Sequence, residues 1–155
     1  MNKEETYKKC YSNIKALTED EHDVIAVMST IACELFHPFD YFNWVGFYRR
    51  INKNTLKVGP YQGMHGCLTI DFNRGVCGTC ATQKTIQLEN DITKAKSHIA
   101  CSSETKAEIV LPIVDINDRL QAVFDIDSTT LNVFDEIDVK YLSKISSCLS
   151  KKYQS

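Results

Sequence analysis

Apolar residues recur at helical spacing near the start of the chain. In residues 3–17, and again in residues 24–35, they stand three or four positions apart, which is the spacing of one face of a helix. Residues 18–21, Thr-Glu-Asp-Glu, fit a capping box that would open the second helix, and His37-Pro38 should end it. The sequence therefore predicts two consecutive amphipathic helices.

The pattern then changes to that of strands. Residues 42–49 are typical of a strand, residues 52–54 of a turn and residues 55–58 of an antiparallel partner, so a hairpin is expected. Glycines punctuate short apolar pieces over residues 59–105, a segment that its composition predicts to be mostly loop. Loops this long inside a compact domain are usually functional or flexible.

A second hairpin and a closing helix follow. Residues 108–116 and 119–127 form the hairpin, joined by a two-residue turn at 117–118. Asn132 or Asp135 opens the helix, whose apolar positions continue to position 149. Helices at both ends and hairpins between them predict an α+β fold, with a central antiparallel sheet and the N-terminal and C-terminal helices packed on one side.

Size and charge narrow the class of protein. The chain has 155 residues without repeats or linkers, so we expect a single domain over residues 1–155. Eighteen basic against 20 acidic residues give a net charge of −2, which argues against nucleic acid as a partner. Neither an export signal nor an apolar run of about 18 residues is present, so we expect a cytoplasmic protein that does not enter a membrane.

The second hairpin gathers acidic residues. Its two-residue turn sets Asp127 opposite Glu108 and Asp125 opposite Val110, so that the three carboxylates share one face. Like charges facing each other destabilise a sheet unless the face is well solvated. Such a cluster favours a site that binds a cation or a ligand's ammonium group, or in which one carboxyl keeps a proton because its pKa is raised.

An aromatic pair lies on the first strand. Trp44, Gly46 and Tyr48 share one face, and Gly46 would leave a notch between two large rings. Such a wall suits a small apolar group with a polar end. Packing of both rings in the core is an equally good interpretation.

Seven cysteines are many for a chain of this size without an export signal. Cys10, Cys33 and Cys148 fall on or beside apolar helix faces, which predicts core packing. The other four lie in the loop-rich middle of the chain, at Cys67, Cys77, Cys80 and Cys101.

Two kinds of chemistry fit these four cysteines. The first is zinc binding, because the spacing of Cys77, Cys80, His98 and Cys101 permits a site with four ligands. Cys67 would not be needed in it. Alternatively, one thiolate acts as a redox nucleophile and a second thiol resolves it. Cys101 is the best candidate for the nucleophile, because His98 and several lysines nearby favour the thiolate.

Several stretches together resemble one family, the free methionine-(R)-sulfoxide reductases, which are built on the GAF domain. The three cysteines at positions 67, 77 and 101 stand where that family has its functional cysteines. The matching stretches, in the family's order, are Trp-Val-Gly-Phe-Tyr at 44–48, Val-Gly-Pro-Tyr-Gln-Gly at 58–63, Gly-Val-Cys-Gly-Thr at 75–79, His-Ile-Ala-Cys at 98–101, Glu-Ile-Val-Leu-Pro-Ile at 108–113 and Asp-Ile-Asp-Ser at 125–128.

The resemblance implies a mechanism and its partners. Cys101 would attack the sulfoxide and become a sulfenic acid, and Cys67 would resolve it as a disulfide, with Cys77 as an auxiliary and Cys80 as another thiol able to divert it. An external dithiol such as thioredoxin would reduce the disulfide, with no cofactor and no metal, and a homodimer is compatible with the family. The residues implied to hold the substrate, free methionine-(R)-sulfoxide, are Trp44, Tyr48, Glu108, Asp125 and Asp127.

Two other functions remain open at this point. GAF domains often sense small molecules without turning them over, and a zinc-stabilised interaction domain would use the cysteines as ligands. Turnover of the sulfoxide separates an enzyme from a sensor, and stoichiometric zinc on Cys101 would prevent that cysteine from acting as a nucleophile.

Overall fold

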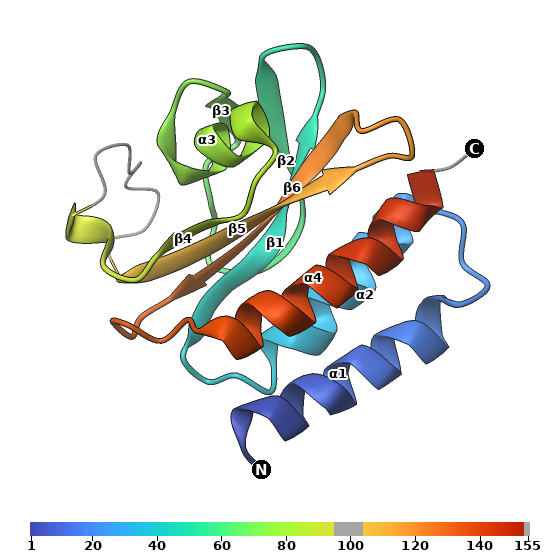
Figure 1. The fold of residues 1–155 in the computed structure, drawn as a ribbon, viewed down its shortest axis with the longest axis vertical. Coiled ribbons are helices and arrows are strands. Elements are labelled where there is room, and N and C mark those ends of the chain that lie inside the picture. The colour runs from blue at the N-terminus through green and yellow to red at the C-terminus, as the bar shows by residue number, and fades with distance from the viewer. Residues whose placement is uncertain (95–103, 154–155) are drawn as a thin grey trace.

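The computed structural model describes residues 1–94 and 104–153. Figure 1 shows a curved sheet with helices on both of its faces. The helices are α1 Lys3–Thr18, α2 Val24–Phe36, α3 Gly75–Gln83 and α4 Glu136–Ser150, with 3-10 turns η1 Ile92–Lys94 and η2 Lys151–Tyr153. The strands are β1 Phe42–Arg50, β2 Thr55–Gly63, β3 Thr69–Asp71, β4 Gln87–Glu89, β5 Ala107–Val114 and β6 Leu120–Ser128.

The six strands are antiparallel neighbours in the order β3-β2-β1-β6-β5-β4. Helices α1, α2 and α4 lie on one face, and α3 lies on the other with the β2–β3 connection (Figure 1). The prediction of an α+β fold with the terminal helices on one side of an antiparallel sheet is therefore confirmed. Within the described residues, no helix combines the length and the apolarity needed to cross a lipid bilayer.

Side-chain alternation divides the core into two clusters. Along β1, Val45 and Phe47 point towards the layered helices, whereas Trp44 and Tyr48 point towards α3. The helix-side cluster is mostly aliphatic and aromatic, and it continues through alternate residues of β5 and β6. The α3-side cluster is smaller and includes two buried thiols, Cys77 and Cys80, so the two faces of one sheet differ in chemistry.

A buried carboxylate holds α1 against α4. Asp138, fully buried on α4, accepts hydrogen bonds from the Tyr7 hydroxyl at 2.6 Å and from Lys3 Nζ at 2.7 Å. It also accepts one from the backbone N–H of Asp135, which caps α4. Of the two cap candidates in the sequence, Asp135 is thus the correct one.

The start of α2 differs from the prediction. Asp23 caps this helix by accepting from the N–H groups of the next turn, and the predicted capping box at residues 18–21 is wrong. Thr18 instead ends α1, where its hydroxyl donates to the Ile14 carbonyl at 2.7 Å. Asp23 prevails because it stands directly before the apolar repeat of α2.

The segment predicted to be mostly loop contains regular structure, because β2 runs on to Gly63 and α3 follows β3. The sequence hides α3 because the helix has no side-chain cap and holds a glycine in its middle. That glycine is needed: a Cβ on Gly78 would lie 2.7 Å from the Phe72 carbonyl oxygen and 2.8 Å from that of Asp71. This close approach packs α3 against the segment that immediately precedes the helix.

The second hairpin has the predicted register near the acids but a longer turn. The expected pairing holds from Ala107 to Ile113, and a shift follows before Val114. Asp115 organises the turn, because its carboxylate accepts from Asn117 N at 2.8 Å and from Arg119 N at 3.0 Å. The predicted two-residue turn is therefore wrong. The register shift before Val114 confines the error to the turn end of the hairpin, so the pairing near the acids is as predicted.

The three cysteines predicted to fill the core have different environments. Cys10 is buried in the helix-side cluster, as predicted. Cys148 is only half-buried, and Cys33 is exposed on α2, so core packing is wrong for Cys33. Its position lies beside the apolar face rather than on it.

Candidate active site

Three acidic side chains meet on the α3 side of the sheet. Glu108 on β5 lies opposite Asp127 on β6, and Asp125 lies opposite Val110, which confirms the predicted register. Glu108 and Asp125 are 7% and 4% exposed, and Asp127 is half-buried. These three carboxylates therefore do not lie on a well-solvated face, so they are not ordinary surface charges of a strand.

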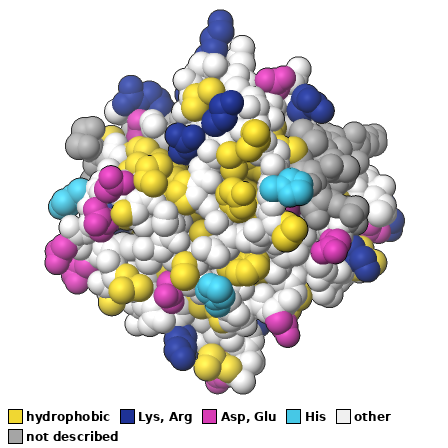
Figure 2. All heavy atoms as spheres, turned by 180° about the vertical axis from the view of Figure 1, so that it is seen from behind, with side chains coloured by type: hydrophobic (Ala, Val, Ile, Leu, Met, Phe, Trp, Pro, Cys, Tyr) yellow, Lys and Arg dark blue, Asp and Glu magenta, His cyan; other side chains and the backbone are white. Residues whose placement is uncertain are grey.

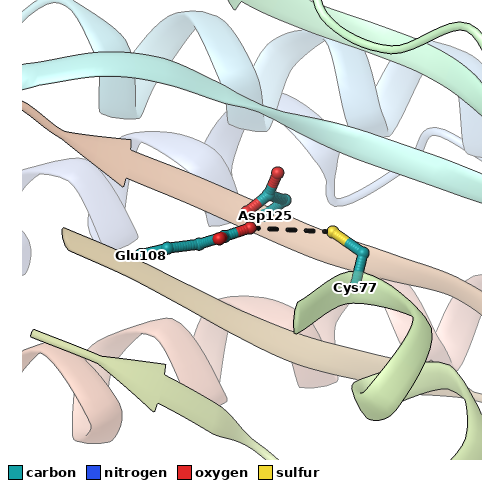
Figure 3. A group of neighbouring side chains, drawn as sticks. All are labelled: Cys77, Glu108 and Asp125. Atoms are coloured by element: carbon teal, nitrogen blue, oxygen red, sulfur yellow. Dashed lines mark hydrogen bonds between the residues drawn. The ribbon is translucent and has the colours of Figure 1, made fainter. Parts of the chain in front are cut away.

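Helix α3 adds a thiol to these acids. The Cys77 thiol donates to Glu108 Oε1 over 3.9 Å, and Asp125 lies on the neighbouring strand beside them (Figure 3). One donor atom from each of these three residues lies within 4.8 Å of the others. The sequence placed Cys77 in a loop, whereas the fold packs it on the acidic face, and we name Cys77, Glu108, Asp125 and Asp127 the acidic cluster.

Burial keeps the acidic cluster partly protonated. It raises the pKa of Asp125 well above its usual value, and the charges of Asp127 and Glu108 raise that pKa further. Burial and then the charge of Glu108 raise the pKa of Asp127 as well. For Glu108, burial raises the pKa against the opposing effect of hydrogen bonds with Asp125 and Cys77. Two carboxyl groups that hydrogen-bond to each other share a proton, so the cluster offers a proton donor.

The thiols of α3 are held in the protonated form. Burial raises the pKa of Cys77 well above its usual value, and the charges of the neighbouring acids raise it further. Burial, followed by the charge of Glu108, raises the pKa of Cys80 to about 12. Both are free thiols. Neither environment favours a thiolate, which argues against either residue as the primary nucleophile.

An aromatic stack adjoins the acids. The Trp44 ring stacks on Tyr48 with centroids 5.4 Å apart, and on Tyr61 with centroids 5.1 Å apart. A Cβ on Gly46 would collide with Tyr61 and lie 2.8 Å from the Trp44 ring, so the predicted notch is filled and that interpretation is wrong. Trp44 and Tyr48 are buried in the α3-side cluster, in keeping with the alternative of core packing, and they form one wall beside the acids.

Tyr61 is a residue of this region that the sequence analysis missed. It lies on β2 directly opposite Gly46, in the part of the chain that was expected to be loop. A glycine on one strand often lies opposite a large ring on the next, and this pattern could have indicated Tyr61. The predicted strand ended at position 58, however, so Tyr61 was not placed opposite Gly46.

The β2–β3 connection brings Cys67 to the same place. A Cβ on Gly66 would lie 2.9 Å from the Tyr48 hydroxyl, so this connection crosses the aromatic wall closely. Cys67 is half-buried, packs against the α3-side cluster and is disulfide-bonded. His98 and Cys101, the two remaining residues of the predicted redox and zinc arrangements, lie outside the described residues.

The predicted zinc set finds only partial support. Cys77 and Cys80 lie on one helix, but Cys80 is not part of the group of described residues that could hold a metal ion. That group consists of Cys77, Glu108 and Asp125. The described donors thus favour the acids rather than Cys80 as companions of Cys77.

Some buried polar atoms around the acidic cluster lack hydrogen-bond partners. They are Trp44 Nε1, Asp125 Oδ1 and Asp127 Oδ1, which lie on the same face of adjacent strands β1 and β6. Buried polar groups are normally paired, so this set points to a ligand with donor and acceptor groups of its own.

Comparison with known proteins identifies the family of the chain. The family model for the GAF domain matches residues 18–150, which defines the class of protein. The chain is 34% identical to the free methionine-R-sulfoxide reductase of Saccharomyces cerevisiae, over 97% of this chain and 87% of that protein. It is 39% identical to Protein YtsP of Bacillus subtilis, over 96% of this chain and 91% of that protein.

A solved structure extends the likeness. The X-ray structure of free methionine-R-sulfoxide reductase from Neisseria meningitidis in complex with its substrate has a TM-score of 0.92 and 34% identity, over 99% of this chain and 91% of that one. The chain belongs to the free methionine-R-sulfoxide reductase family of GAF domain proteins, which are oxidoreductases. The resemblance seen in the sequence is confirmed.

Proposed function

We propose that this protein reduces free L-methionine-(R)-sulfoxide to methionine. The observation that carries the proposal is the acidic cluster buried against the Trp44–Tyr48 wall, with unpartnered polar atoms on that face. An ionised carboxylate pairs with an α-ammonium group, and the aromatic wall suits the thioether end. A methionine sulfoxide inside a peptide lacks the ammonium charge, so this site favours the free amino acid.

The acidic cluster also supplies an acid. A sulfoxide oxygen becomes a better leaving group when it is protonated, and the raised pKa of Asp125 favours a carboxyl group that carries a proton. The remaining negative charge of the cluster is free to hold the ammonium group. One buried group of acids therefore serves both binding and proton transfer.

The electrons come from thiols. The thiolate of Cys101 attacks the sulfur of the protonated sulfoxide. The hydroxyl group passes from that sulfur to the Cys101 sulfur as the sulfur–oxygen bond breaks, so methionine leaves and Cys101 becomes a sulfenic acid. A second thiol condenses with it, releasing water and forming a disulfide. An external dithiol of the thioredoxin type then reduces the disulfide by exchange, so one dithiol is oxidised for each sulfoxide reduced. No resident cofactor is needed, and a reducing cytoplasm supplies the dithiol.

Cys67 is the better resolving thiol. It is half-buried beside the aromatic wall and already disulfide-bonded, whereas Cys77 and Cys80 are deeply buried free thiols with raised pKa values. Exposed apolar side chains at Met64 and Leu68, 73% and 70% exposed, flank Cys67 and leave its surroundings open to a protein reductant.

Turnover tests the proposal directly. We expect methionine to form from free methionine-(R)-sulfoxide with dithiothreitol, and we expect Cys101→Ser to abolish its formation. Cys33→Ser changes an exposed thiol on α2 and serves as the matched control. Full activity of Cys101→Ser would refute the mechanism, whereas binding without turnover in the wild-type protein would identify a sensor.

A further inference from the structure

Three side chains of the acidic cluster form a donor set suited to a metal ion. A sulfur of Cys77 and one oxygen each of Glu108 and Asp125 lie within 4.8 Å of one another, and all three residues are buried. They project from α3, β5 and β6 towards a common point (Figure 3). Tetrahedral zinc, with bonds of about 2.3 Å to sulfur and about 2.0 Å to oxygen, separates these atoms by about 3.5 Å. The present separation of 3.9 Å between Cys77 and Glu108 is close to that value.

A second observation points to a cation. Asp125 is 4% exposed, yet its Oδ1 has no hydrogen-bond partner among the described residues. When the carboxyl group of Asp125 is ionised, this oxygen accepts a hydrogen bond or binds a positive charge, so a donor or a cation fits beside it. Three acids in one buried cluster also repel one another, and a cation removes that repulsion.

We propose that Cys77, Glu108 and Asp125 form a three-ligand site for zinc, and that zinc bound there closes the acidic cluster to the substrate. The closing effect rests on the proposed function, because zinc and the α-ammonium group would compete for the same carboxylates. The binding itself does not depend on that function.

The donor types select the metal. Magnesium and calcium require about six or more oxygen ligands, which this buried group does not provide. A thiolate with two carboxylates suits zinc, and the fourth tetrahedral position is left to water. Zinc replaces the proton of the Cys77 thiol and the proton shared by Glu108 and Asp125, so binding releases protons to the solvent.

Cobalt(II) provides a direct probe, because a cobalt–thiolate bond gives a charge-transfer absorption band. The titration uses full-length protein reduced with a phosphine, since a dithiol would itself bind the metal. We expect one equivalent of cobalt to produce the band and one equivalent of zinc to remove it. Cys77→Ser should abolish the band, and Asp125→Asn should weaken binding at least tenfold.

Matched variants separate this site from other thiols. Cys80→Ala and Cys33→Ser should keep the band, because neither residue belongs to the donor group. A band that persists in Cys77→Ser would overturn the proposal. A band that is lost in Cys101→Ser but unchanged in Asp125→Asn would also overturn it and assign the metal to the cysteine and histidine set predicted from the sequence. Glu108→Gln, with the fold checked by circular dichroism, replaces Cys77→Ser if that variant does not fold.

The only tryptophan of the chain reports on competition. In Cys101→Ser, which should bind the sulfoxide without turning it over, Trp44 fluorescence follows sulfoxide binding. We expect saturating zinc to raise the apparent Kd at least tenfold. An unchanged Kd with an intact cobalt band would overturn the closing effect. Failure of the proposed function would appear separately, as absent turnover in metal-free wild-type protein.

Discussion

The two faces of the sheet are built from alternate residues of the same strands, yet they serve different ends. On the helix side, Phe47 and Phe124 stack with centroids 4.6 Å apart in a cluster without buried carboxylates on the strands. On the α3 side, the same strands carry Trp44, Asp125 and Asp127, each with one side-chain polar atom that is buried without a partner. Ser146 Oγ on α4 is also buried without a partner, but on the α3 side such atoms lie beside buried acids, and that face suits a ligand that supplies their partners.

One face of the molecular surface carries side chains of mixed character. Figure 2 shows the molecule from behind relative to Figure 1, and exposed apolar side chains lie there between acidic and basic ones. Charges of both signs are thus mixed on this face, whereas the acids of the acidic cluster are largely buried. A substrate that carries a positive group would gain most of its specificity inside the site rather than from attraction over a distance.

The largest effect on stability is expected on the helix side. Phe47→Ala removes a fully buried ring that stacks on Phe124, so we expect the free energy of unfolding to fall by about 3–5 kcal/mol. Denaturant unfolding measures this change. Sulfoxide binding by the fraction that remains folded should be nearly unchanged, and a selective loss of binding would contradict the division of roles between the faces.

On the α3 side, Asp125→Asn should impair turnover strongly but should not destabilise the fold. We expect turnover to fall about 100-fold or more, because the proton donor is lost. The free energy of unfolding at pH 7.5 should rise by about 1 kcal/mol, because the folded wild-type protein has to keep a buried acid that ionises freely when unfolded.

The pH dependence checks the sign of this effect. A raised pKa in the folded state means that the folded protein holds a proton that the unfolded chain loses, so Asp125 becomes more destabilising as pH rises above its unfolded pKa. The advantage of Asp125→Asn should therefore shrink from pH 7.5 to pH 5. An advantage that grows towards pH 5 would show that Asp125 is ionised in the folded protein.

The sequence predicted the features that depend on local spacing, but it did not predict those that depend on packing on the α3 side. Periodicity located α1, α2 and α4. The register assumed for the second hairpin placed Glu108 opposite Asp127, and it holds there because the shift before Val114 compensates for the longer turn. The helix that carries Cys77 was missed, because it depends on a close approach that only Gly78 permits. The depth to which the acids are buried likewise depends on α3 and on the β2–β3 connection, neither of which is visible as a pattern in the strands.

The smallest effects are expected at the helix starts, where the two faces also differ. Asp23 caps α2 with its side chain, whereas Arg74, exposed and extended at the start of α3, makes no such hydrogen bond. Asp23→Ala should lower the free energy of unfolding by about 1 kcal/mol, and Arg74→Ser should raise it by about 0.5 kcal/mol.

Urea midpoints measure both changes, with Asp23→Ser as the conservative control because serine also caps. Arg74→Ser adds an acceptor for the free N–H groups of α3 and leaves the acidic cluster untouched, so sulfoxide binding followed by Trp44 fluorescence should not change. A variant that is more stable but binds more weakly would mean that α3 has to move when the ligand enters. The absence of a side-chain cap would then serve ligand binding by allowing that movement.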